Sequence, residues 1–188
     1  MATEQMTGFG GKQAWLAVRS AAPADVISAL GLRDLGTVPW RDGIDLAHLT
    51  DDRVAVTPPI DGWILATGRY LMRPDRPVDV IGLSAALHTE VQYFATHRVT
   101  ESHRWQRAAD GELIRAFGYV GQTGEVTSWH GEPNPAERAA GLPVELDEES
   151  TVLVGENDVL GVAAAWSIDP STLSGRTAPG PLHLGAAD

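Results

Sequence analysis

The stretch VQYFATHRVTESHRWQRAADGELIRAFGYV, residues 91–120, decides the fold class of this chain. In its first part, Val91–Arg107, more apolar odd-numbered residues alternate with more polar even-numbered ones, which predicts one long strand whose odd-numbered side chains share a face. Asp110–Gly111 is a strong hairpin signal, so Leu113–Val120 is expected to return as the neighbouring strand. After another turn, Glu125–His130 supplies a third strand. The stretch therefore predicts an antiparallel β-meander.

The rest of the chain combines short strands and helices, whose ends are marked by Pro, Gly and capping residues. A loop that includes a short helix near Leu46 is expected over Leu32–Leu49. We expect strands at Gln13–Arg19, Arg53–Thr57 and Trp63–Tyr70, and helices at 23–30, Val78–His88, Pro135–Ala140 and Asp158–Ile168.

This order of elements predicts an α+β fold with a curved antiparallel or mixed sheet, a C-terminal β-meander and three to four packed helices. Residues 13–170 are expected to form a single domain. Residues 1–12 are polar and Gly-rich and are expected to be a flexible N-terminus. Residues 171–188 lack periodicity and are rich in Pro, Gly and Ala, so we expect a flexible tail.

The composition narrows the possible classes of function. Hydrophobic residues make up 43% and charged residues 21% of the 188 residues, as in an ordinary globular protein. No apolar run approaches the roughly 20 residues of a membrane-spanning helix, and Met1–Lys12 lacks the apolar core of a signal peptide. We therefore expect a cytoplasmic protein that does not act in a membrane. The absence of cysteine excludes disulfides, thiolate metal sites and cysteine nucleophiles.

The net charge of −11 is unevenly distributed. Residues 1–100 carry 11 acidic and nine basic side chains, whereas residues 101–188 carry 14 acidic and five basic ones. Such a surface repels phosphate backbones, which argues against nucleic-acid binding. It suits a basic protein partner or a cationic ligand, or it serves solubility alone. The candidate partner-binding residues lie in the acidic stretch before the last helix: Glu145, Asp147, Glu148 and Glu149.

The odd-numbered face of the long predicted strand gathers the groups best suited to chemistry. With Asp110–Gly111 as a two-residue turn, Trp105 is expected opposite Ala116 and His103 opposite Gly118. Small residues opposite large ones leave room for a pocket. Glu101 and His103 are the candidate catalytic residues, and the candidate pocket residues are Tyr93, His97, Trp105 and Gly118.

Three interpretations of this face remain open. His97, Glu101 and His103 could bind a divalent metal, but the two histidines would lie about 20 Å apart along a strand, too far for one ion. Glu101 and His103 could form an acid–base pair, since a carboxylate raises the pKa of a neighbouring imidazole and selects its tautomer. All three could instead be ordinary polar residues of the core and rim. We assign no metal ion and no cofactor.

Several short runs resemble a group of uncharacterised proteins from Streptomyces-like actinobacteria. They are GWILA (62–66), VQYF (91–94) followed by His97–Arg98, GEP (131–133) and AWSIDP (165–170), and the likeness covers residues 13–172. That group has no settled activity, so the resemblance implies no catalytic residue. As a small acidic α+β chain without cysteine, the protein is also similar in type to immunity and accessory proteins of bacterial toxin or natural-product clusters.

The leading hypothesis is a protein-binding, immunity-like accessory protein that uses its acidic surface against a basic partner. The alternative is a small-molecule-binding protein or a cofactor-independent enzyme with a His/Glu pocket. Only the alternative requires a concavity beside Ala116 and Gly118. An open sheet edge would permit a homodimer as well as a monomer.

Overall fold

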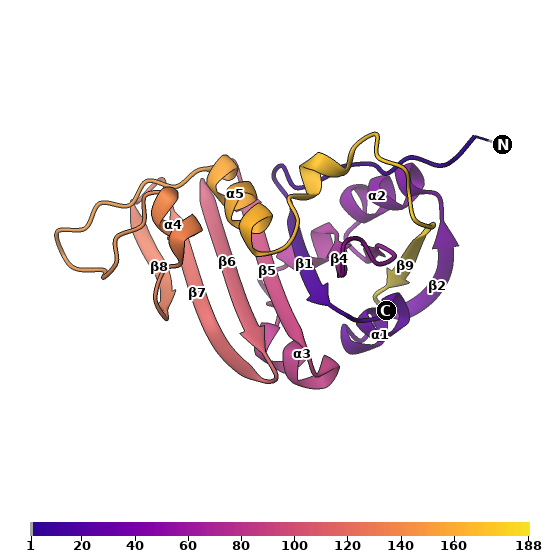
Figure 1. Cartoon of the computed structure of the whole chain (residues 1–188), viewed down its shortest axis with the longest axis horizontal. Coiled ribbons are helices and arrows are strands. Elements are labelled where there is room, and N and C mark those ends of the chain that lie inside the picture. Colours follow the sequence, from indigo (N-terminus) through magenta and orange to yellow (C-terminus); the bar gives the residue numbers. More distant parts are fainter. Residues whose placement is uncertain (1) are drawn as a thin grey trace.

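A computed structural model describes residues 2–188 of the chain. These residues form a single α+β domain around a nine-stranded antiparallel sheet with the strand order β2-β9-β3-β4-β1-β5-β6-β7-β8, which does not close into a barrel (Figure 1). The strands are β1 (Ala14–Arg19), β2 (Arg33–Val38), β3 (Arg53–Val56), β4 (Trp63–Thr67), β5 (Glu90–His97), β6 (Ser102–Ala109), β7 (Glu112–Val120), β8 (Glu125–His130) and β9 (Leu182–Ala186).

Five α-helices accompany the sheet, one more than the upper limit expected from the sequence. The additional helix is α2, which extends the short helix expected near Leu46 to ten residues. Within residues 2–188, no helix has both the length and the hydropathy needed to cross a bilayer. The helices are α1 (Pro23–Ala29), α2 (Trp40–Leu49), α3 (Val80–Leu87), α4 (Pro135–Ala139) and α5 (Glu156–Trp166), with 3-10 turns η1 (Arg69–Met72) and η2 (Pro170–Leu173).

Side chains alternate across each strand, and the central strands carry a hydrophobic core on each face of the sheet. On one face, Trp15 and Phe94 pack into a core that also receives side chains of α2 and α5. On the opposite face, Leu16 and Tyr93 pack with α1 and α3. We call these the α5 face and the α3 face. Figure 1 shows α4 and α5 in front of strands β5–β8.

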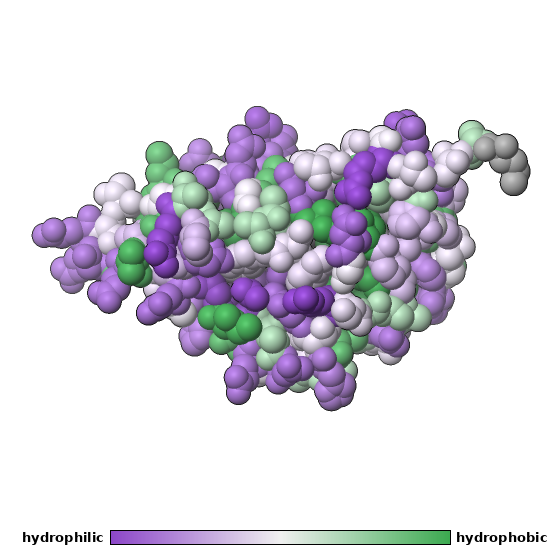
Figure 2. Space-filling view, in the orientation of Figure 1, coloured by the Kyte–Doolittle hydropathy of each residue, from purple (hydrophilic) through white to green (hydrophobic). Residues whose placement is uncertain are grey.

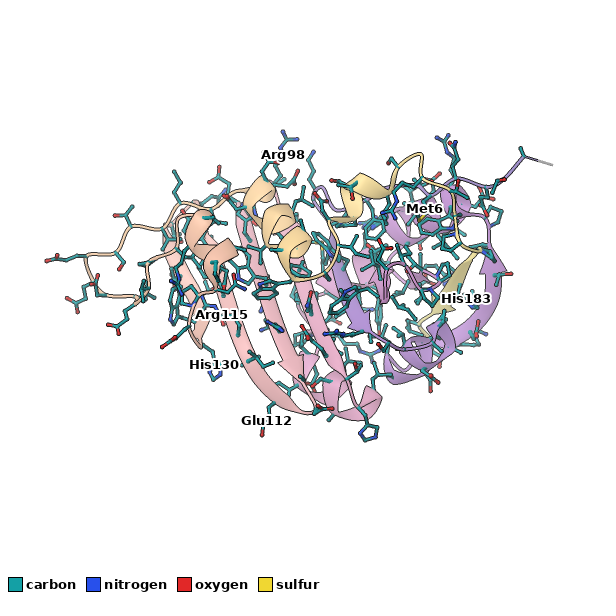
Figure 3. The ribbon with its side chains drawn as sticks, viewed as in Figure 1. Met6, Arg98, Glu112, Arg115, His130 and His183 are labelled. Atoms are coloured by element: carbon teal, nitrogen blue, oxygen red, sulfur yellow. The ribbon has the colours of Figure 1, made fainter. Side chains whose placement is uncertain are left out.

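The expectation of one continuous strand over Val91–Arg107 is wrong. The chain turns at residues 98–101, so that Phe94 pairs with Trp105 and Thr96 with His103. A strand of that length would extend about 56 Å at about 3.3 Å per residue, far beyond the six-residue neighbour β1. Figure 3 labels Arg98, a residue of this turn, at the upper edge of the molecule.

The next hairpin confirms the predicted turn but corrects the register. Asp110 and Gly111 have φ values of 48° and 84°, as a two-residue hairpin turn requires. A β-bulge between Arg107 and Ala108 then shifts the pairing by one residue, which places His103 opposite Tyr119 and not opposite Gly118. Trp105 accordingly pairs with Phe117, whereas Ala116 was expected.

Neither end of the described chain is the flexible segment that the sequence suggested. At the C-terminus, β9 inserts between β2 and β3, and Leu182 is fully buried. At the N-terminus, Met6 and Phe9 are buried in the α5 face. Met1 lies outside the described residues. A strand of five residues that follows Gly180–Pro181 and contains Gly185 carries too little local signal to be predicted, but its place between β2 and β3 supplies hydrogen bonds from both sides.

Candidate functional site

The turn at residues 98–101 separates the side chains that were expected to share one face. Tyr93 and His97 lie on the α3 face, whereas His103 and Trp105 lie on the α5 face. Glu101 lies in the turn itself with φ of 49°. The single pocket proposed for these five residues therefore does not form.

His103 is a buried residue of the α5 face, with 5% of its surface exposed. Its Nδ1 lies 3.0 Å from the Thr96 hydroxyl, which in turn lies 3.5 Å from Glu156 Oε2. Burial lowers the pKa of His103, and this outweighs the nearby carboxylates of Glu156, Glu101 and Asp158, which raise it. The neutral imidazole is therefore favoured, and the ring is packed in the interior of the protein.

Trp105 and Gly118 also have packing roles. Trp105 is fully buried, and its indole N–H donates to Glu137 Oε1 at 2.6 Å. A Cβ at Gly118 would lie 2.6 Å from Thr127 Oγ1, so the space above this glycine is already filled by β8. The lack of a side chain at Gly118 thus allows β8 to pack closely against β7, and no concavity lies above this glycine.

A cleft of about 550 Å³ lies where β4 and β5 end and β1 begins, and we call it the His97 cleft. It contains one of the predicted pocket residues, His97, but its other walls come from segments far apart in the sequence. The residues that line it are Gly11, Lys12, Gln13, His48, Asp51, Arg69, Met72, Arg73, Pro74 and His97.

Local structure holds the walls of the His97 cleft in place. The Lys12 backbone N–H donates to Glu156 Oε2 at 2.9 Å, which ties the turn before β1 to the first residue of α5. The Gly10 N–H donates to Gln13 Oε1 at 2.7 Å within the same turn. On the other side, η1 carries Arg69 into the cleft immediately after β4.

The His97 cleft is cationic although the protein is strongly acidic. Its lining includes Lys12, Arg69 and Arg73 but a single carboxylate, Asp51. Arg69 pairs with Asp51 at 3.2 Å, and both side chains are more than half exposed. Arg73 pairs with Asp75 and lowers the pKa of that exposed carboxyl group. Among residues 2–188, the Lys12 ammonium forms no ion pair.

The two histidines of the cleft differ in their surroundings. His48 Nδ1 lies 3.0 Å from the Ile44 carbonyl and Nε2 lies 2.9 Å from the Thr67 hydroxyl, so both ring nitrogens are occupied. Burial lowers the pKa of His48, which favours a neutral ring. His97 is exposed, and its Nδ1 lies 3.0 Å from the Thr100 hydroxyl. Its Nε2 is therefore the imidazole nitrogen available to a ligand.

The predicted partner-binding residues lie on an exposed loop between α4 and α5, at the projecting left end of Figure 1. Figure 2 shows hydrophilic side chains gathered at this end, with separate hydrophobic patches beside them. Three aliphatic side chains of the loop are exposed, Val144, Leu146 and Leu153, the last with 83% of its surface accessible. All four acidic candidates are exposed: Glu145, Asp147, Glu148 and Glu149.

Sequence reasoning missed every cationic residue of the His97 cleft. Lys12 lies in a segment expected to be flexible, and Arg69 and Arg73 follow a strand without any motif.

In the part of the chain that the structure describes, no three His, Asp or Glu side chains lie close enough to hold a metal ion. Comparison with family models, with curated proteins and with solved structures finds no match to this chain.

Proposed function

We propose that the protein binds a small anionic molecule in the His97 cleft. The observation that carries the proposal is the convergence of Lys12, Arg69 and Arg73 in one cavity of a protein whose net charge is −11. Since the overall charge repels anions, a local cluster of cations of this kind favours selective capture over general electrostatic attraction. The cavity volume also falls within the usual range for small-molecule sites.

The chemistry of the lining supports an anion over a cation or an apolar molecule. Arg and Lys side chains form charge-assisted hydrogen bonds with phosphate and carboxylate oxygens. The exposed pair between Arg69 and Asp51 contributes little in water, so an anion can replace Asp51 as the partner of Arg69 at small cost. His97 Nε2 adds a further donor. Binding is favoured over catalysis by Glu101 and His103, because neither residue lines the cleft.

Titration with inorganic phosphate at low ionic strength tests the proposal. We expect the NMR signals of Lys12 and His97 to shift saturably, and Arg69→Gln to weaken binding by at least about tenfold, the loss expected for one charge-assisted hydrogen bond. Arg176→Gln is the matched control, because Arg176 is exposed, forms an ion pair of the same kind and does not line the cleft. Equal weakening by both variants, or no shift at Lys12 and His97, would contradict the proposal.

A second candidate function is protein binding through the loop between α4 and α5. The observation in its favour is the combination of exposed aliphatic and acidic side chains on one projecting segment, since apolar contacts give affinity and charges give orientation and speed. An arginine-rich peptide is a suitable probe. We expect the double variant Glu148→Lys/Glu149→Lys to bind it more weakly and with a flatter salt dependence than Glu112→Lys/Glu125→Lys, which has the same net charge. Equal binding by the two double variants would rule the loop out.

A further inference from the structure

We infer that the anionic molecule is elongated, with a negatively charged group at each end, and that its second end occupies a chamber adjoining the His97 cleft. The inference rests on the proposed function, because it assigns the first charged group to that cleft. It adds a second binding position, which we call the Arg104 chamber, and a chemical class of ligand.

The Arg104 chamber has a volume of about 390 Å³ and lies on the α3 face of β5 and β6. Two of its residues, Arg104 and Gln106, come from β6, and Tyr93 comes from β5. The 3-10 turn η1 and the segment that follows it supply the remaining walls, which apart from Arg73 are apolar: Leu71, Met72, Pro74, Pro77 and Val78. No carboxylate lines the chamber, so its only charges are those of Arg73 and Arg104.

Arg104 is a cation without an anionic partner. Its guanidinium lies 5.9 Å from the centre of the Tyr93 ring, and among residues 2–188 it forms no ion pair. Gln106, two residues further along the same face, is half-buried and offers an amide beside it. Burial raises the pKa of Tyr93 to about 12, so its hydroxyl group stays neutral. The hydroxyl donates its hydrogen bond to the Leu71 carbonyl at 2.8 Å and is therefore not available to an anion. An anionic group would thus meet a free guanidinium and a neutral amide.

The two cavities are neighbours. Both are lined by the same three consecutive residues, Met72, Arg73 and Pro74. Both also open on the same face of β5, where His97 lines the first cavity and Tyr93 the second. The residue between them on this face is Ala95, which is buried and lines neither cavity, so the connection runs over Met72, Arg73 and Pro74.

The spacing of the cavities indicates the length of the ligand. Tyr93 and His97 are four residues apart on β5, which corresponds to about 13 Å at about 3.3 Å per strand residue. Arg104 pairs with Ala95, between them, but its guanidinium lies 5.9 Å from the centre of the Tyr93 ring and thus at the far end of this span. A compact ion such as phosphate cannot contact both ends over that distance. A linear molecule that carries two phosphates or carboxylates can, and Arg73, which lines both cavities, lies within reach of it. Asp75 holds Arg73 through two hydrogen bonds, so a ligand that binds Arg73 exchanges with this pair or shares the guanidinium with it.

Calorimetric titration with two linear bisphosphates of different length tests the inference. Hexanediol bisphosphate is long enough to place one phosphate in each cavity, and ethanediol bisphosphate is too short. We expect one hexanediol bisphosphate to bind per chain, at least about tenfold more tightly than ethanediol bisphosphate, because the second contact becomes intramolecular. Arg104→Gln should abolish this advantage and leave the shift of His97 by inorganic phosphate unchanged. Arg98→Gln, which removes an exposed arginine outside both cavities, is the matched control.

The outcomes separate this inference from the proposed function. If inorganic phosphate shifts the His97 signal but the longer bisphosphate gains no affinity, the second position is wrong and the cleft proposal stands. An affinity advantage that survives Arg104→Gln also overturns the second position. If inorganic phosphate has no effect at His97, both proposals fail.

Discussion

Replacing Glu137 by Gln should destabilise the protein strongly, because Glu137 is the acceptor for three buried donors. Its Oε1 accepts from Trp105 Nε1 at 2.6 Å and from Arg115 Nε at 2.8 Å. Its Oε2 accepts from the Asn134 backbone N–H at 2.9 Å, which completes the capping box of α4. The Glu137 side chain is fully buried and that of Arg115 is 3% exposed. Figure 3 shows Arg115 within the meander part of the sheet.

The magnitude follows from these contacts. A glutamine can keep Oε1 as an acceptor, but its NH2 group then faces the Asn134 N–H, so one donor loses its partner. The change also leaves the guanidinium of Arg115 buried without a counter-charge. Breaking a buried ion pair by removing one partner costs about 3–5 kcal/mol, which is a large part of the roughly 5–15 kcal/mol that stabilises a typical domain. Carbonyl oxygens of His130 and Gly131 still accept from Arg115, which places the expected loss near the lower limit.

Urea denaturation followed by tryptophan fluorescence measures this free energy of unfolding. Asp61→Asn is the control, because it removes an ion pair of 3.4 Å whose carboxylate side chain is 71% exposed. We expect that control to lose at most about 1 kcal/mol. If Glu137→Gln loses no more than Asp61→Asn, the reasoning from burial and donor count is refuted.

Two further predictions concern backbone strain and pH. Gly131→Ala should lower the free energy of unfolding by about 2 kcal/mol or more, because the φ of Gly131 is 74° and a Cβ would overlap the Ile114 carbonyl. Gly124→Ala should lower it by about 1 kcal/mol, because Gly124 has a similar φ of 68° but open space around it. Equal urea midpoints for the two variants would contradict the steric argument. Burial lowers the pKa values of His48 and His103, so the unfolded chain binds more protons than the folded one below about pH 6.5. We therefore expect the free energy of unfolding to fall between about pH 7 and pH 5, and less steeply in His103→Gln; a constant or rising stability on acidification would refute this.

Local signals in the sequence were sufficient to predict several elements of the fold. Asp110–Gly111 predicted its turn correctly, since positive φ at both positions is a property of those two residues and their neighbours. Asn134, Pro135 and Glu137 likewise predicted the start of α4, because a capping box involves only residues within one helical turn. The α+β class and the β-meander followed from such short-range patterns.

The cavities depended on contacts that no short-range pattern contains. The four-residue turn at 98–101 decided which side chains of β5 and β6 share the α3 face, because strand side chains alternate with period two and the turn sets the pairing of the two strands. Tyr93 and His97 line two different cavities, and His103 lines neither of them.

The amino-acid sequence thus carried enough local information to predict the α+β class, the turn at Asp110–Gly111 and the start of α4, but not the turn at residues 98–101. The insertion of β9 between β2 and β3, and the meeting of Lys12, Arg69 and His97 in one cleft, were decided only in the folded chain. The physical reason is that local propensities act over a few residues, whereas the pairing of distant strands is selected by the burial of whole faces and the satisfaction of all their backbone hydrogen bonds.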